Sequence, residues 1–369
     1  MRVGLVLAAA LVTTHAAAFE PTGFPEADAL LAAIERDGEQ VTGVGTVRQV
    51  AGNIILTDVV TEAPGTPAHS CVVGSLSLTA PRLVDGVLHA DRLSAANVRI
   101  ALGRELTEIA RTTAHDVRLS PGVLSIKAPI VEGLRAFGAF TIHNMRTTGD
   151  GATLSIALAT FTPDAQHGDG LLGGKLVLSE ITARAPGPGD PFAGLAIAPA
   201  QVTLQFAWDE TGVLEMPLVT LDLPGLVSAH GSATLSGLTP ESDFQLTHPA
   251  PDNPPALQTV LLRGATLTLS NVGIGDAVSA AMGRAMGLPR DVARMIQQQA
   301  IAGALFAIED ETLRESFALA TATMLASGPG RVILTLAPDA PTPLATVNAA
   351  LSGDDAALRA LGLTVATTP

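Results

Sequence analysis

GSLSLTAPRLVDGVLHADRLSAANVRIAL, residues 74–102, is the stretch that decides the fold class of this chain. Apolar and polar residues alternate in its segments SLSLTA, GVLHADRL and NVRIAL, and residues that favour turns separate these segments. Alternation is typical of a strand with one buried face, and short alternating runs between turn residues indicate antiparallel pairing. The stretch therefore predicts consecutive antiparallel β-strands.

The same pattern extends in both directions, from about residue 40 to residue 275. Alternating or β-branched segments recur at 45–50, 53–60, 123–128, 152–161, 175–183, 201–208, 232–238 and 265–270. No long helical segment interrupts them, which disfavours the βαβ units of a parallel sheet. We expect residues 40–275 to form an antiparallel β body, as an elongated, twisted or curled sheet.

Helical patterns lie on both sides of this β body. Residues 25–37 (PEADALLAAIERD) predict a helix, with Pro25 in its first turn and Gly38 at its stop, so residues 19–39 form an N-terminal helical segment. After residue 275 the apolar spacing changes to that of helices. The sequence therefore predicts an α+β protein that is mainly antiparallel β, with a helical C-terminal segment over 276–369 packed on the sheet.

Three helices are expected within residues 276–327. Asp276 is expected to cap the first, Pro289 to open the second, and Thr312 with Glu315 to form a capping box for the third. Their Met and Phe stripes are typical of core that faces a sheet, and a lipid-facing surface is the alternative. A strand at 331–337, short helices at 344–351 and 355–361, and a final apolar run at 363–367 complete the segment.

The N-terminus has the pattern of a secretory signal peptide. Met1-Arg2 is a basic start, residues 3–12 are apolar, and Ala16-x-Ala18 is a small-residue cleavage site. The apolar run is shorter than the ~20 residues that a transmembrane helix needs. We therefore expect residues 1–18 to be removed before Phe19 and the mature chain to be a periplasmic protein without a transmembrane segment.

Charge and composition narrow the choice of partners. The net charge is −14, and lysine occurs only at Lys127 and Lys175. A nucleic-acid partner requires a basic face to neutralise phosphates, so this partner class is not expected.

The stretch HGDGLLGGKLVLSEI, residues 167–181, contains the glycine pattern Gly168-x-Gly170-x-x-Gly173. A phosphate-binding loop joins a strand to the N-terminus of a helix, whereas a strand-like segment follows these glycines. The sequence therefore predicts a hairpin turn. Asp164, His167 and Asp169 in the same loop are too scattered for a calcium loop.

Other catalytic patterns are absent, including Gly-x-Ser-x-Gly, Ser-x-x-Lys and His-Glu-x-x-His. His89, His115 and His143 would form a zinc triad only if the strand register gathered them on one face, and solvent-side positions fit the pattern better. We therefore predict no catalytic, cofactor-binding or metal site, and no cofactor.

Cys71 is the only cysteine, so an intrachain disulfide is impossible. It fits a small buried hydrophobe. A thiol activated by His69 and a disulfide between two chains are the alternatives.

The successive strands of residues 74–102, the segment LTLSNVGIGDAVSAAMGRAMGLP and the ending GRVILTLAPDAPTPL…LRALGLTV resemble alphaproteobacterial envelope proteins of the AsmA-like kind. The resemblance covers much of residues 40–369 in style and carries no functional residue across. It implies long β-sheets that curl into an apolar groove, in a group associated with lipid transfer and outer-membrane maintenance.

Three classes of function follow. The first is a non-catalytic binding module that holds a lipid or another apolar ligand in a β groove. The second is a periplasmic structural scaffold, with an envelope protein as its partner and no ligand. An enzyme, the third class, would show convergent polar groups in a pocket.

Overall fold

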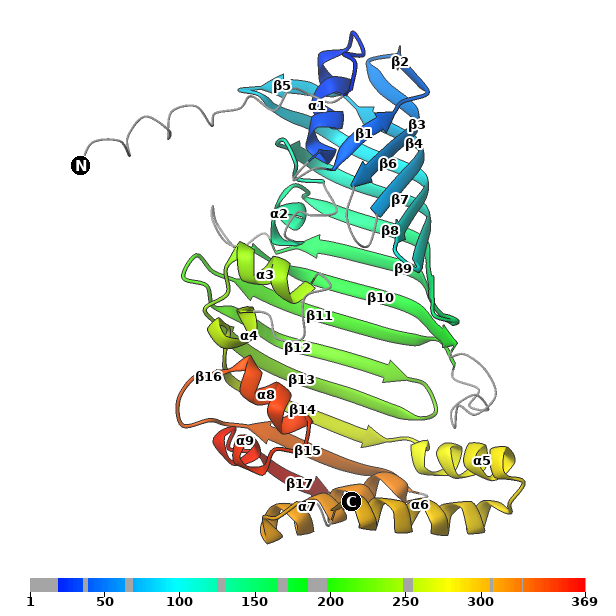
Figure 1. The fold of residues 1–369 in the computed structure, drawn as a ribbon, viewed down its shortest axis with the longest axis vertical. Helices are drawn as coiled ribbons and strands as arrows, with labels where there is room; N and C mark the ends of the chain where they lie inside the picture. The colour runs from blue at the N-terminus through cyan, green and yellow to red at the C-terminus, as the bar shows by residue number, and fades with distance from the viewer. Residues whose placement is uncertain are drawn as a thin grey trace, which may run out of the picture.

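The computed structural model describes residues 19–35, 39–63, 69–124, 130–164, 172–184, 198–247, 255–305, 308–326 and 328–368. Strands within these ranges form one open sheet that runs the length of the molecule, with helices along one side and at the C-terminal end (Figure 1). The predicted architecture, mainly antiparallel strands with helices concentrated in the C-terminal part, is confirmed.

The sheet is an antiparallel meander in which strands pair with their neighbours in sequence. Short strands complete the sheet: β1 and β2 both pair with β3, β5 continues the line of β4 along β6, β16 continues that of β15 along β14, and β17 pairs with β15. The strands are β1 (Gln40–Gly43), β2 (Thr46–Val50), β3 (Asn53–Ala63), β4 (His69–Thr79), β5 (Arg82–Val84), β6 (Val87–Leu102), β7 (Glu105–Leu119), β8 (Ala139–Gly149), β9 (Ala152–Pro163), β10 (Leu172–Arg184), β11 (Ala200–Trp208), β12 (Leu214–Leu223), β13 (Val227–Ser236), β14 (Leu261–Asn271), β15 (Gly330–Leu336), β16 (Thr342–Pro343) and β17 (Thr364–Thr368).

The sheet has two chemically different faces, which follow from the alternation in the sequence. We call the face that carries Ile54, Leu56 and Leu88 the inner face, and the opposite one the outer face. These three side chains are fully buried, as are Leu30 and Leu31 of helix α1 (Pro25–Ile34), which packs against β3 and β6. The helix ends three residues earlier than predicted, because Glu35 already has an extended backbone.

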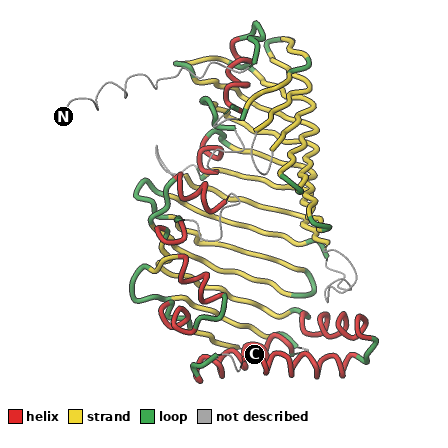
Figure 2. Tube along the Cα trace, viewed as in Figure 1, coloured by secondary structure: helices red, strands yellow, loops and turns green. Residues whose placement is uncertain are grey.

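Five short helices line one margin of the inner face (Figure 2). They are α2 (Ile130–Arg135), α3 (Pro240–Thr247), α4 (Ala256–Thr259), α8 (Leu344–Leu351) and α9 (Asp355–Ala360). Leu172, Trp208, Leu238 and Val260 form one buried cluster at this margin, and Leu262, Ala350, Ala357 and Leu361 form the next. The helices at the margin therefore bury the ends of the strands.

Parts of the predicted β body differ from the expectation. Helices α2, α3 and α4 lie within residues 40–275, where only strands were expected. The strand predicted at 123–128 is also wrong at its start, because Val123 and Leu124 form a turn, and residues 125–129 lie outside the described ranges. Val123 is instead part of the buried cluster beneath α1. Its apolar character reflects this packing and not a strand.

Three longer helices cover the C-terminal end of the sheet: α5 (Ile274–Met286), α6 (Arg290–Leu305) and α7 (Glu311–Leu325). Helix α7 contacts β14, β15 and β17, whereas α5 and α6 contact each other and α7. Asn271 at the end of β14 holds the C-terminal end of α7 against the sheet. Its amide nitrogen donates to the carbonyl oxygens of Thr323, Ala326 and Gly328 at 3.4, 2.9 and 3.1 Å.

The starts of these helices correct two predictions. Helix α5 begins at Ile274, and Asp276 lies in its first turn, where it forms ion pairs with Arg290 and Arg294 of α6. The cap of α7 is Asp310, whose carboxylate accepts a hydrogen bond from the Leu313 N–H at 2.9 Å. Thr312 therefore lies inside the helix and not at its cap.

The apolar stripes of these helices are also less buried than expected. Buried positions are occupied by small residues, and large apolar side chains lie half-buried or exposed, as at Met286 and Met295, which are 50% and 52% exposed. The buried small residues are Gly275, Ser279, Ala281, Gly283, Ala293 and Ala320.

A row of unusual backbone positions crosses the sheet from β3 to β10. Left-handed residues occupy alternate strands of this row, with φ of 51° at Asp58, 55° at Asn97, 52° at Asn144 and 54° at Glu180. The register on both sides places Gly74, Ala110 and Ala157 opposite them on the strands between. We call these seven residues the crease.

The residue types in the crease have a steric cause. Asn and Asp tolerate the left-handed region better than other residues with a Cβ atom. A Cβ atom added at Gly74 would lie only 3.1 Å from the Cβ atom of Asn97, so the facing residue must be small. At the crease two consecutive residues face outward, and the buried positions step by three, as from Leu56 to Val59 and from Ile156 to Ala159.

Candidate functional site

The inner face carries an apolar surface across β10, β11 and β12 that we call the floor. Cross-strand rows place Leu176 beside Leu204 and Val219, and Leu178 beside Val202 and Leu221. These six side chains are half-buried, whereas inner-face residues beneath α1, such as Ile54 and Leu56, are 0% exposed. The floor therefore lacks the full cover that α1 gives the N-terminal part of the sheet.

The apolar surface continues towards the C-terminal end. On β13 the inner-face positions next to the floor are Ala229 and Gly231, and on β14 they are Leu269 and Leu267. Leu267 is 37% exposed. Small residues on β13 thus lie between two strands with larger apolar side chains, which makes this part of the surface lower than its surroundings.

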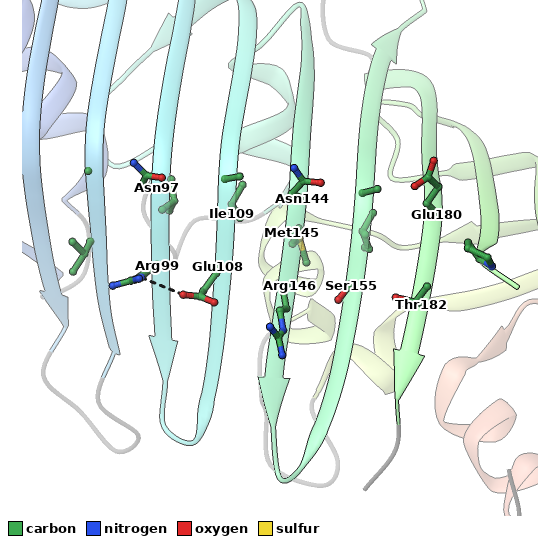
Figure 3. Close-up of a pocket in the computed structure, with 17 residues that line it drawn as sticks. Asn97, Arg99, Glu108, Ile109, Asn144, Met145, Arg146, Ser155, Glu180 and Thr182 are labelled. Carbon is green, nitrogen blue, oxygen red and sulfur yellow. Dashed lines mark ion pairs between the residues drawn. The ribbon is translucent and has the colours of Figure 1, made fainter. Parts of the chain in front are cut away.

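The outer face holds a shallow furrow of about 770 Å³ that crosses β4 and β6–β10. The small crease residues Gly74, Ala110 and Ala157 are among the residues that line this furrow. Asn97, Asn144 and Glu180 form one bank, and Arg99, Glu108, Arg146, Ser155 and Thr182 form the other (Figure 3). The furrow is a product of the crease, because the crease requires small residues on every second strand.

Arginines dominate the outer face of β6, β7 and β8. We call Arg92, Arg99, Arg111, Arg118 and Arg146 the arginine patch, and all five are exposed. Three carboxylates lie among them, at Asp91, Glu108 and Asp116. Arg99 pairs with Glu108 at 3.2 Å, and Asp91 lies 3.9 Å from Arg82 on β5. The patch is therefore a positive region on a chain whose net charge is −14.

The three candidate histidines share the outer face, but the register separates them. His89 lies opposite Arg118, His115 opposite Arg92, and His143 opposite Arg111. Within the described ranges, no three His, Cys, Asp or Glu side chains form a group that could hold a metal ion. The register therefore places each of these imidazoles beside an arginine of the arginine patch.

Cys71 is half-buried and packs against the core cluster beneath α1. Burial, together with the nearby carboxylate of Glu39, raises the pKa of its thiol to about 11. His69 is on the same strand two residues away, on the same face. A thiol with a raised pKa stays protonated at neutral pH, which argues against the nucleophilic alternative.

The glycine-rich stretch is only partly described. Strand β10 begins at Leu172 and continues through Lys175, as the turn prediction requires, whereas Gly168, Gly170, His167 and Asp169 lie outside the described residues. The proposed signal peptide, residues 1–18, also lies outside them.

Sequence reasoning missed the residues that build the furrow. Their signal is a break in the alternation, where two successive inward-facing apolar positions are separated by two residues instead of one. Asp58, Asn97 and Asn144 each lie at such a break. When such a segment is interpreted as a regular alternating strand, this step is overlooked, because the apolar content on both sides is unchanged.

Comparisons with known proteins add little about function. In the part of the chain that the structure describes, no helix has both the length and the apolar character needed to cross a bilayer. No curated protein matches the sequence. Residues 220–368, from within β12 to the end of β17, match a family model described as an uncharacterized protein.

Proposed function

We propose that this chain is an exported, non-catalytic envelope protein that binds a lipid or another long apolar ligand on the inner face of its sheet. The observation that carries the proposal is the half-buried floor of Leu176, Leu178, Val202, Leu204, Val219 and Leu221. A large apolar surface that its own chain does not fully cover is typical of an interaction or ligand site. The resemblance to AsmA-like envelope proteins supports the same proposal.

The energetics favour a ligand with an acyl chain. Burial of apolar surface is worth roughly 25 cal/mol per Å², so an acyl chain that buries a few hundred Å² gains several kcal/mol. Because association has its own free-energy cost, a gain of this size predicts weak to moderate binding. Because the floor is apolar, recognition of the headgroup contributes little, and binding is expected to be indifferent to it.

The test uses delipidated full-length protein incubated with mixed phospholipids, repurified and analysed for bound lipid by native mass spectrometry. Leu204→Asn places a polar group on the floor and should abolish retention. Thr203→Asn is the matched control, because Thr203 is the neighbouring half-buried residue on the opposite face of β11. If the unmodified protein retains no lipid, the proposal fails and the structural scaffold without a ligand becomes the better explanation.

A further inference from the structure

The middle of β13 carries only small residues on the inner face. Ala229, Gly231 and Ala233 follow one another on this face, and we call them the low strip. Ser232 lies between them on the outer face, where its hydroxyl group hydrogen-bonds that of Thr266 at 2.9 Å. Larger apolar side chains flank the strip: Met216, Val219 and Leu221 on β12, and Leu267 and Leu269 on β14. The strip is therefore a depression that runs along β13 and adjoins the floor.

The depth of the low strip is fixed by the backbone. A Cβ atom added at Gly231 would collide with the carbonyl oxygen of Thr266 on β14, so the close approach of the two strands requires glycine here. Strands β12 and β14 lie two strand spacings apart, about 9.6 Å. A ligand on the strip can therefore approach the backbone of β13 only if it is narrow enough to pass between the side chains of these two strands.

The chain itself covers both ends of the strip. At one end, Leu235 packs against both buried clusters at the helical margin, and one of these clusters includes Ala350 of α8 (Figure 1). At the other end, Val227 is 8% exposed and lies opposite Asn271, which holds α7. The Cα atoms of Val227 and Leu235 lie roughly 27 Å apart in an extended strand. The open part of β13 is thus long, narrow and limited at both ends.

This shape favours one unbranched alkyl chain. Such a chain is thin and flexible, needs no hydrogen-bond partner, and gains dispersion contacts along its whole length. A rigid fused-ring molecule such as a sterol is wider and meets Val219 and Leu267 before it reaches the strip. The strip and the positions that flank it carry no charge, so a carboxylate or headgroup stays outside it.

We propose that the low strip determines ligand specificity, by holding a lipid through one straight acyl chain that lies along β13. This inference rests on the proposed lipid binding and adds to it a position, a direction and a selection against wide ligands. Ala229, Gly231 and Ala233 make room for the chain, and Leu267 limits the width of what fits.

The test uses delipidated full-length protein and all-trans parinaric acid, a straight fatty acid whose fluorescence reports binding. Palmitate and cholesterol then compete for the site. Palmitate should displace the probe, and cholesterol should be at least about tenfold less effective, because a ligand that overfills a packed site binds poorly.

Variants locate the site and test its width. Ala229→Leu fills the strip and should weaken binding of parinaric acid at least about tenfold. His230→Leu is the matched control, because His230 is the next residue of β13 and is exposed on the outer face. Leu267→Ala removes a flanking side chain that is 37% exposed, and it should improve competition by cholesterol relative to palmitate. This second variant decides the question if Ala229→Leu does not fold.

The outcomes separate this inference from the proposed function. If the unmodified protein binds neither parinaric acid nor phospholipid, the proposed lipid binding fails and this inference fails with it. If Ala229→Leu binds parinaric acid as tightly as His230→Leu, lipid binding stands and the low strip is not the site. Equal competition by palmitate and cholesterol, or no change of their ratio in Leu267→Ala, would overturn the proposed selection by width.

Discussion

At the scale of single residues, backbone conformation at the crease constrains the sequence more tightly than burial does. Asn144 is exposed, yet its φ of 52° lies in the left-handed region, which disfavours β-branched and bulky side chains. Its neighbour across the strand pair is Ala157, another of the small residues of the crease. An exposed position in a strand is ordinarily tolerant of substitution, and the crease residues are the exception.

We predict that Asn144→Val lowers the free energy of unfolding by about 1–2 kcal/mol, because a β-branched residue is strained in the left-handed region. Asn144→Gly should stay within about 0.5 kcal/mol of the original protein. Urea unfolding measures both. Thr141→Val on the same strand and face is the control, and an equal loss there would contradict the role of backbone conformation.

Cys71 gives a prediction about reactivity. With the pKa of the thiol raised from 9.0 to about 11, the folded protein holds about 100-fold less thiolate at pH 8. Alkylation by iodoacetamide should therefore be slower by about this factor than in urea-unfolded protein. Equal rates in the two states would show that the thiol of the folded protein is accessible and that its pKa is not raised.

The same shift predicts a loss of stability at high pH. The folded state holds the thiol proton more tightly than the unfolded state. The stability that this difference contributes is therefore fully present below pH 9 and is lost as the pH rises towards 11. Cys71→Ala should lose less stability than the original protein between pH 9 and pH 11. A parallel decline of the two unfolding free energies would contradict the assigned pKa.

At the scale of elements, cover by helices separates a filled core from an open surface. Leu31 of α1 is fully buried against the sheet, whereas Leu319 of α7 is 59% exposed. Leu31→Ala should therefore cost about 2–5 kcal/mol of unfolding free energy, and Leu319→Ala less than about 0.5 kcal/mol. Thermal or urea unfolding compares these two identical substitutions, and a cost at Leu319 as large as that at Leu31 would reverse the assignment of core and surface.

The cap of α7 can be tested in the same way. Asp310→Ala removes the hydrogen bond to the Leu313 N–H and should cost about 1 kcal/mol. Thr312→Ala should have little effect, because Thr312 lies within the first turn. If the unfolding free energy falls for Thr312→Ala and not for Asp310→Ala, the result would support the capping box predicted from the sequence instead.

Alternation predicted many of the strands over residues 40–275, because one face of each is more apolar than the other, but β7, β8 and β12 were not among the predicted segments. It was not sufficient to predict α2, α3 and α4, the short helices at the margin that lie within this range. Helix α4 has only four residues, which is too short for a helical period to be visible. The furrow was also missed, because it depends on side chains that meet only through the register of six strands.

At the scale of the whole molecule, export remains a prediction of the sequence. Intact-mass analysis and N-terminal sequencing of protein from a periplasmic fraction should show a chain that begins at Phe19. Full-length protein recovered only from the cytoplasm would contradict it. This measurement is independent of the proposed lipid binding, which concerns the mature sheet.

The neighbour-to-neighbour pairing of the strands makes sheet length an evolvable quantity. Each hairpin contacts mainly the hairpins before and after it, as in a quasi-one-dimensional repeat array. Gain or loss of one hairpin would change the span of both faces by about 10 Å and leave the remaining pairings intact. On the proposed function, relatives with more or fewer hairpins would accommodate larger or smaller apolar ligands with the same local chemistry.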